Sequence, residues 1–335
     1  MVNGHIAKNM QKSSKSAQAR GKKSTESIQM KHYILGTALS LLALNTPALA
    51  QDDATATALG INTINAAQTL ITSVEYMLDH SCQISLSESA EAVTALQNDV
   101  ETFHSTLALL RTGGEAEGIA PVRSRRAQRA LDTLEQEVEA YLAFATFGTR
   151  GTMSAPYLDQ LYLAHAPIPD ASHEVVDVLN TTFMLQRIGM LESSTLGALT
   201  DITQRATTIS ANLCLIAVDQ HSDAAIATLN DVLQEIEQNL DLLATGDAMQ
   251  KILPPTPEMR AALDCVAADF TEVQSFVAPY LDGTTRPTVE QFAHASAMLG
   301  ALEANAQTSV EVFEADVIGT PTANDGCTAP RNPAS

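Results

Sequence analysis

Two arginines, each next to a glutamine, offer the clearest chemistry in this sequence: Gln186-Arg187 and Gln204-Arg205. Guanidinium groups hold planar oxyanions through several N–H donors, so Arg187 and Arg205 could converge on a small anion between two helices. The competing interpretation is that they face solvent or pair with carboxylates. In a chain with 19 Lys and Arg against 39 Asp and Glu, this second interpretation is favoured.

A second basic cluster consists of Arg123, Arg125, Arg126 and Arg129, at the start of a predicted helix. It could dock an acidic partner protein or an anionic ligand. Positive charges at a helix N-terminus oppose the helix dipole, so this placement costs local stability unless nearby carboxylates neutralise it. A solvated helix start is the simpler interpretation, and a partner patch is the functional one.

Other kinds of site find little support. No histidine pair has the HExxH spacing, and no histidine stands with cysteines at zinc-finger spacing, so we expect no metal. The sequence has no G-x-S-x-G, S-x-x-K or P-loop motif, and no tryptophan for a sugar-stacking cleft. We therefore predict a protein that is not an enzyme and has no cofactor.

The elements that carry these residues are predicted to be helices throughout. Apolar residues recur at spacings of three and four, beginning with Ile61 and Ile64, as expected for one buried helix face. An S-x-x-E capping box is predicted at Ser85 and a T-x-x-Q box at Thr288. Thr256-Pro257-Glu258 predicts another helix start, with Thr256 as the cap and proline at the first helical position. The predicted helices cover about 61–82, 89–111, 122–147, 172–199, 201–218, 222–243, 257–280 and 289–317, with a short one near 157–163. The helix over 172–199 could continue into the next one.

Residues 30–50 have the features of a secretory signal peptide. A short basic start precedes an apolar run, 33–44, that is too short for an ordinary membrane span, and an A-x-A cleavage site ends at Ala50. We expect a mature chain that begins at Gln51, lies in the periplasm or is secreted, and does not span the membrane. Residues 1–29 would then be a misassigned N-terminal extension, with a basic nucleic-acid tail as the less favoured alternative.

The mature chain would be strongly acidic. Residues 1–50 hold 7 of the 19 Lys and Arg and 1 of the 39 Asp and Glu, so without them the formal net charge falls from −20 to −26. Such a surface repels nucleic acid and anionic lipid headgroups, and we expect neither as a partner.

The four cysteines favour two disulfides over a metal site, because an exported chain meets an oxidising compartment. Three pairings of Cys82, Cys214, Cys265 and Cys327 are possible on the sequence alone. We favour Cys265 with Cys327, because a returning C-terminal tail could reach the helix that carries Cys265. That choice leaves Cys82 for Cys214.

The same pattern occurs twice in the chain. The pentapeptide APYLD recurs at 155–159 and 278–282, and the first copy carries two insertions. The duplication predicts an all-α fold of two tandem up-and-down four-helix-bundle units, 51–200 and 201–318, followed by a tail, 319–335. Pairs that share one constant offset include Cys82 with Cys214, Gly114 with Gly246, and Ala130-Leu131-Asp132 with Ala262-Leu263-Asp264.

This repeated pattern resembles the N-terminal sensing domain of type IV pili methyl-accepting chemotaxis transducers, the PilJ-type domain. That domain is itself similar to the periplasmic parts of nitrate and nitrite sensors. Residues 204–277 carry the resemblance best: a helix with its cysteine, an acidic helix that ends in a glycine, a proline-rich loop and a PEMRAAL helix start follow in the family's order. The stretch LNTTFMLQRIGML, from Leu179, resembles the family's following helix. Together the two copies cover about residues 55–318.

The resemblance implies a sensory module but not nitrate binding. Family members typically open the first helix with an arginine-rich run, and related nitrate sensors use an arginine there to hold the anion. The corresponding stretches here, TLITSVEYMLDHSC and DITQRATTISANLC, have no arginine and only Arg205, respectively. A buried monoanion needs a fixed cation or several N–H donors to offset its desolvation, so nitrate is disfavoured.

We therefore expect a periplasmic sensory or ligand-binding module that presents a small ligand, or its own helices, to a membrane receptor. The duplication, the signal peptide and the family pattern all point in this direction. The alternative is a periplasmic adaptor that binds a partner protein through its helical surfaces and takes no small ligand.

Overall fold

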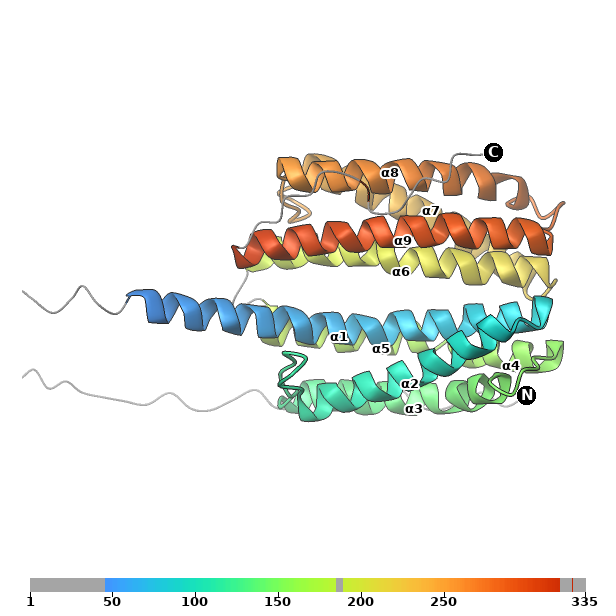
Figure 1. Cartoon of the computed structure of the whole chain (residues 1–335), viewed down its shortest axis with the longest axis horizontal. Helices are drawn as coiled ribbons and strands as arrows, with labels where there is room; N and C mark the ends of the chain where they lie inside the picture. The colour runs from blue at the N-terminus through green and yellow to red at the C-terminus, as the bar shows by residue number, and fades with distance from the viewer. Residues whose placement is uncertain (1–45, 185–188, 320–326, 328–335) are drawn as a thin grey trace, which may run out of the picture. The chain divides into compact units, whose positions relative to one another are not determined.

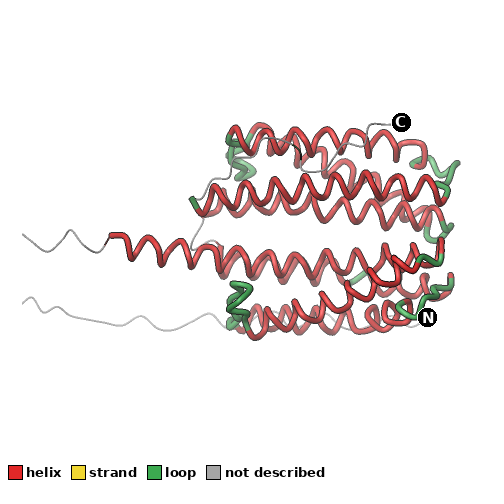
Figure 2. The backbone as a smooth tube through the Cα atoms, viewed as in Figure 1, coloured by secondary structure: helices red, strands yellow, loops and turns green. Residues whose placement is uncertain are grey.

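A computed structural model describes residues 46–184, 189–319 and 327 of the chain. The chain divides into residues 1–45 and a compact unit formed by 46–335. Helices joined by short loops make up the described part of this unit, without any strand, which confirms the all-α class (Figure 2). None of the described helices is long and apolar enough to cross a membrane.

Most helices lie close to the predicted ranges, and the short helix expected near 157–163 is present as α4, but α1 begins at Thr46 instead of near 61 and ends at Ser87 instead of near 82. In the compact unit α1 packs against α2 and α6, α6 against α7 and α9, α8 against α9, and α3 against α4 and α5 (Figure 1). Their bounds are α1 (Thr46–Ser87), α2 (Ala90–Thr112), α3 (Arg125–Gly148), α4 (Ala155–His165), α5 (Ile168–Leu179), π-helix η1 (Asn180–Met184), α6 (Gly189–Ala217), α7 (Ser222–Thr245), α8 (Pro257–Val277), 3-10 turn η2 (Ala278–Tyr280) and α9 (Val289–Ile318).

The two predicted capping boxes have different outcomes. The box at Thr288 is confirmed: its hydroxyl accepts from the N–H of Gln291 (3.2 Å), and the Gln291 side chain accepts from the N–H of Thr288 (2.9 Å). The box at Ser85 is wrong, because α1 continues to Ser87 and buries Ile84. The residue that caps α2 is Ser89, whose hydroxyl accepts from the N–H of Ala92 (3.1 Å).

The connection between the two predicted units also differs from the expectation. The single helix expected over 172–199 is replaced by α5 and η1, and α6 then starts at Gly189, which has a φ of 81°. Helix α6 runs unbroken from Gly189 to Ala217 and so spans the junction between the helices expected over 172–199 and 201–218. The predicted continuation across this junction is confirmed.

Both disulfides have the pairing favoured on the sequence, Cys82 with Cys214 and Cys265 with Cys327. The first links α1 to α6, and both of its cysteines are fully buried, at 0% exposure. The second ties Cys265 of α8 to Cys327, which is exposed. The two bridges therefore differ in their access to solvent.

This difference predicts the order in which the bridges are reduced. Mild dithiothreitol treatment of the native protein should break Cys265–Cys327 first, because thiol–disulfide exchange requires the attacking thiolate to reach a sulfur atom. Alkylation followed by mass spectrometry should then find labels on these two cysteines only. Equal labelling of Cys82 and Cys214 under native conditions would contradict the prediction.

Two loops have the same local structure 133 residues apart, one residue more than the separation of 132 between Cys82 and Cys214. The helix cap Gly246 therefore corresponds to the cap Gly113, and the predicted pairing of Gly114 with Gly246 is wrong by one residue. The loop after α2 is closed by paired backbone hydrogen bonds between Gly114 and Ile119, and the loop after α7 by the same pairing between Asp247 and Ile252. In the first loop the buried Thr63 hydroxyl accepts from the N–H of Ala120 (3.0 Å) and donates to the carbonyl of Leu59 (2.7 Å).

The second loop makes the same kind of contact with a threonine of α6. The Thr195 hydroxyl accepts from the N–H of Leu253 (2.9 Å) and donates to the carbonyl of Leu191 (2.8 Å). Each threonine thus holds a loop against the helix that carries it, α1 in one case and α6 in the other.

Replacing either threonine by valine should lower the free energy of unfolding by about 1–2 kcal/mol, because a loop N–H that is buried (Ala120) or partly buried (Leu253) loses its acceptor. Urea unfolding of Thr63→Val and Thr195→Val measures the loss. Thr112→Val serves as a control, since the hydroxyl of Thr112 is exposed and bonds no backbone N–H in the described structure. Unchanged stability in both test variants would contradict a structural role for these hydroxyls.

Candidate functional site

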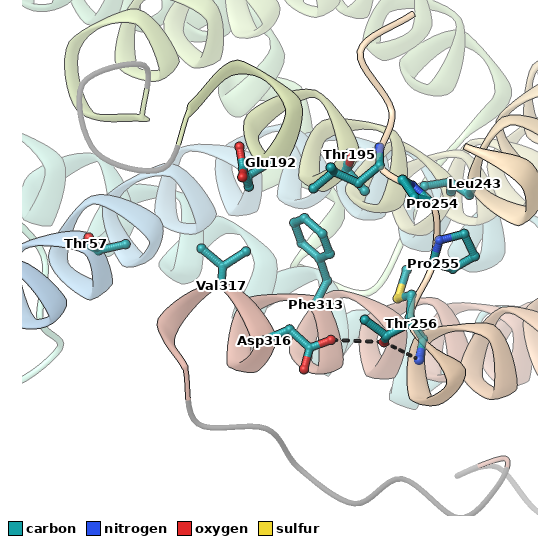
Figure 3. Close-up of a pocket in the computed structure, with 12 residues that line it drawn as sticks. Thr57, Glu192, Thr195, Leu243, Pro254, Pro255, Thr256, Phe313, Asp316 and Val317 are labelled. Atoms are coloured by element: carbon teal, nitrogen blue, oxygen red, sulfur yellow. Dashed lines mark hydrogen bonds between the residues drawn. The ribbon is translucent and has the colours of Figure 1, made fainter. Parts of the chain in front are cut away.

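A cavity of about 510 Å³ lies where the ends of α6, α7, α8 and α9 meet, with one residue contributed by α1 (Figure 3). Concave sites of this kind, mostly apolar with a few polar groups, are typical of small-molecule binding. We call it the helix-end cavity. The described residues that line it are Thr57, Glu192, Thr195, Leu243, Leu253, Pro254, Pro255, Thr256, Met259, Phe313, Asp316 and Val317.

The loop 246–256 forms one wall of the helix-end cavity. Gly246 has a φ of 71°, and an added Cβ would lie 2.6 Å from the backbone nitrogen of Pro254, so the tight turn requires glycine at this position. The loop ends at Thr256, whose hydroxyl caps α8 by accepting from the N–H of Met259 (3.2 Å), as the sequence predicts. Backbone geometry therefore fixes the loop at Gly246, and a side-chain cap fixes it at Thr256.

The apolar lining comes from helix ends that face the interior. Leu243, Met259 and Phe313 are buried, at no more than 7% exposure, and the Phe313 ring points from α9 toward Glu192 and Thr195 of α6 (Figure 3). Leu253, Pro254 and Pro255 complete this lining from the loop. An apolar body of ligand size would therefore find apolar contacts from three helices and the loop.

The polar lining consists of hydroxyls and carboxylates. The Thr195 hydroxyl donates to Leu191, and the Thr256 hydroxyl donates to the Asp316 carboxylate (3.1 Å), so both donors are occupied. The remaining polar side chains are the carboxylates of Glu192 and Asp316 and the hydroxyl of Thr57. No Lys, Arg or His is among the described lining residues.

The predicted anion residues are only partly described. Gln204 and Arg205 line a second cavity, of about 370 Å³, whereas Gln186 and Arg187 lie outside the described residues. Nε of Arg205 pairs with Asp201 (2.5 Å), and Nη1 pairs with Glu235. This guanidinium is thus already paired with two carboxylates, as expected if Arg205 neutralises nearby acidic residues and does not bind an anion.

The predicted partner patch is exposed. Arg123, Arg125, Arg126 and Arg129 all face solvent, and among the described residues none of the four forms an ion pair. Nε of Arg129 donates to the carbonyl of Arg125 (3.2 Å). An arginine of α2, Arg111, takes up the carboxylates of Asp132 and Glu135 instead (2.9 and 2.7 Å).

Buried titratable groups gather on α1, away from the helix-end cavity. Asp79 accepts from Ser210 of α6 (3.0 Å) and Gln83 (2.9 Å), and burial raises the pKa of Asp79 to about 6 despite these bonds and the nearby His80. Burial lowers the pKa of His80, but its hydrogen bond and ion pair with Asp99 (2.6 Å) outweigh burial and raise this pKa overall.

Two further contacts of α1 involve titratable groups. Glu75 pairs with His165 of α4 (3.0 Å), and Tyr76 bonds Glu303 of α9, a carboxyl whose pKa burial raises to about 7. Each of these groups already has a protein partner. In the described part of the chain, no three His, Cys, Asp or Glu side chains are grouped so as to hold a metal ion.

No protein-family model, curated protein or solved structure matches the chain. The site is therefore defined by its own geometry. On the sequence alone, none of the residues that line the helix-end cavity is identified as part of a site, and Thr256 is predicted only as a helix cap. The available signal was the repeated threonine, because Thr63 and Thr195 are separated by the same offset as Cys82 and Cys214.

Proposed function

We propose that the chain is an exported sensory module of the PilJ type that binds a small ligand in the helix-end cavity. The observation that carries this proposal is the cavity itself, which is concave, mostly apolar and formed by helix ends. The two disulfides support export, since such bridges persist in oxidising compartments. Residues 30–50 would serve as the signal peptide, with cleavage after Ala50.

Two helical units related by duplication remain part of the proposal. The matching loop closures after α2 and α7, the matching hydrogen bonds of Thr63 and Thr195, and a disulfide between the equivalent Cys82 and Cys214 support it. In this arrangement α1 and α6 are the first helices of the two units, and the bridge joins them directly.

A ligand in the helix-end cavity would act on the helices that line it. It would contact α6, α8 and α9 together with Thr57 of α1, so its binding energy would favour one arrangement of these helix ends over others. A membrane receptor that recognises this arrangement would then detect the ligand indirectly. This is the presentation role that the family resemblance implies.

A thermal-shift screen tests the proposal, because a ligand that binds only the folded state raises the melting temperature by mass action. The screen should include nitrate, nitrite, small carboxylates and small amines. Val317→Phe, which fills part of the cavity, should abolish the shift. Val289→Phe, at an exposed position at the start of the same helix, should preserve it. The absence of any shift dependent on Val317 would argue against ligand binding.

The adaptor function remains a second candidate because of the exposed arginines at the start of α3. Four guanidinium groups that form no ion pair within the described structure could, in so acidic a chain, bind a carboxylate-rich partner protein. One stoichiometric partner should then co-purify at low salt, and the variant with Arg123, Arg125, Arg126 and Arg129 changed to Gln should lose it. An Arg286→Gln control, which removes a different exposed guanidinium, should retain the partner.

A further inference from the structure

We infer that the helix-end cavity selects a ligand with an apolar body and a cationic, hydrogen-bond-donating head, such as a primary amine, and excludes oxyanions. This inference rests on the proposed ligand-binding function and specifies the chemical class of the ligand. It follows from the donors, the charges and the apolar surface of the described lining residues.

The described lining offers an anion few hydrogen-bond donors. The hydroxyls of Thr195 and Thr256 already donate to Leu191 and Asp316, and the N–H groups of Leu253 and Met259 already donate to those two hydroxyls. Pro254 and Pro255 have no N–H. A nitrate or carboxylate ligand would leave water without gaining the donors that offset its desolvation.

The helix-end cavity is instead rich in acceptors. One oxygen of Asp316 accepts from Thr256, and the Glu192 side chain has no hydrogen-bond partner among the described residues. Both carboxylates line the cavity, and no described lining residue carries a positive charge. A ligand that brings its own N–H donors would satisfy these acceptors with charge-assisted hydrogen bonds.

The helix dipoles do not reverse this preference. The N-terminal ends of α6 and α8 and the C-terminal ends of α7 and α9 all contribute lining residues. Since a helix carries about half a positive charge at its N-terminus and half a negative charge at its C-terminus, the four ends roughly cancel. The two carboxylates therefore determine the sign of the local field.

The apolar lining specifies the rest of the ligand. Leu243, Met259 and Phe313 are buried in the wall, so a short alkyl or aryl group would replace water against them. A cation without an apolar group, such as ammonium, would leave this apolar surface hydrated. The ligand class is accordingly amphipathic rather than a bare cation.

Isothermal titration with three probes that share one chain, hexylamine, hexanol and hexanoate, tests the inference at pH 7. Hexylamine should bind at least about tenfold more tightly than hexanoate, with hexanol between them. Asp316→Asn and Glu192→Gln should each weaken hexylamine several-fold and leave hexanol unchanged. Glu311→Gln, an exposed carboxylate change on α9, serves as the matched control.

The possible outcomes separate the two proposals. If hexanoate binds as tightly as hexylamine, and Val317→Phe blocks both, the charge selection is wrong while the ligand-binding function stands. If hexylamine binding survives both Asp316→Asn and Glu192→Gln, the assigned acceptors are wrong. If none of the three probes binds, the inference is overturned, and the thermal-shift screen decides the proposed function by itself.

Discussion

Replacing Cys82 and Cys214 together by alanine is expected to lower the free energy of unfolding by roughly 3–5 kcal/mol. The bridge closes a loop with a sequence separation of 132, and cross-linking residues this far apart removes much of the conformational entropy of the unfolded chain. Both cysteines are fully buried, so the double variant also loses packing between α1 and α6. Guanidinium unfolding monitored by circular dichroism measures the difference.

The control for this experiment keeps the buried bridge and removes the exposed one. Cys265→Ala with Cys327→Ala should leave the packing between α1 and α6 intact. This control still contains the Cys82–Cys214 bridge. Adding a reductant during unfolding should therefore lower its free energy of unfolding further, because the reductant breaks that bridge once the protein unfolds. If the Cys82/Cys214 double variant has the same free energy of unfolding as the unaltered protein, the bridge does not stabilise the fold.

Asp79→Asn is expected to stabilise the protein at pH 8 by up to about 3 kcal/mol. Burial raises the pKa of Asp79 to about 6, and one pKa unit corresponds to about 1.4 kcal/mol between protonation states. Because this folded-state pKa lies above that of the unfolded chain, the contribution to stability is fully present below about pH 4 and is lost as the pH rises through 6. One oxygen of Asp79 is buried without a hydrogen-bond partner among the described residues, which adds to the cost of ionisation.

The measurement is the free energy of unfolding between pH 4 and pH 8. The unaltered protein should lose stability across this range. Glu303 adds to the loss, because burial raises its pKa to about 7. Asp79→Asn should flatten the profile, whereas Glu101→Gln, which changes an exposed carboxylate on α2, should leave the slope unchanged. A variant that is less stable than the unaltered protein at pH 8 would contradict a buried, ionisation-sensitive Asp79.

Local chemistry explains what the sequence could predict about the fold. Apolar spacing located the helices, and the Thr256-Pro257 and Thr288 caps fixed two helix starts to the residue, because a cap depends only on neighbours a few positions away. The Ser85 box failed since a matching motif cannot show whether the preceding helix continues. Burial of Ile84 against the core decided that point.

The candidate site was harder to predict, because its residues come from distant parts of the chain. Thr57, Glu192 and Asp316 meet only through the packing of α1, α6 and α9, and no motif connects them. Arg205 was identified from its type, but its partners Asp201 and Glu235 include a residue on another helix, α7. Side-chain type can suggest a role, whereas tertiary neighbours determine whether the group is available.

The bridge between α1 and α6 also governs what happens when the backbone is cut. Arg150 is exposed in the turn after α3 and is followed by Gly151, so trypsin could cleave there. That peptide bond lies between Cys82 and Cys214, so the disulfide keeps the two fragments covalently joined after the cut. The nicked protein would migrate as one species on a non-reducing gel and as two after reduction. The disulfide thus keeps the two halves of the chain together even when the backbone at this turn is cut.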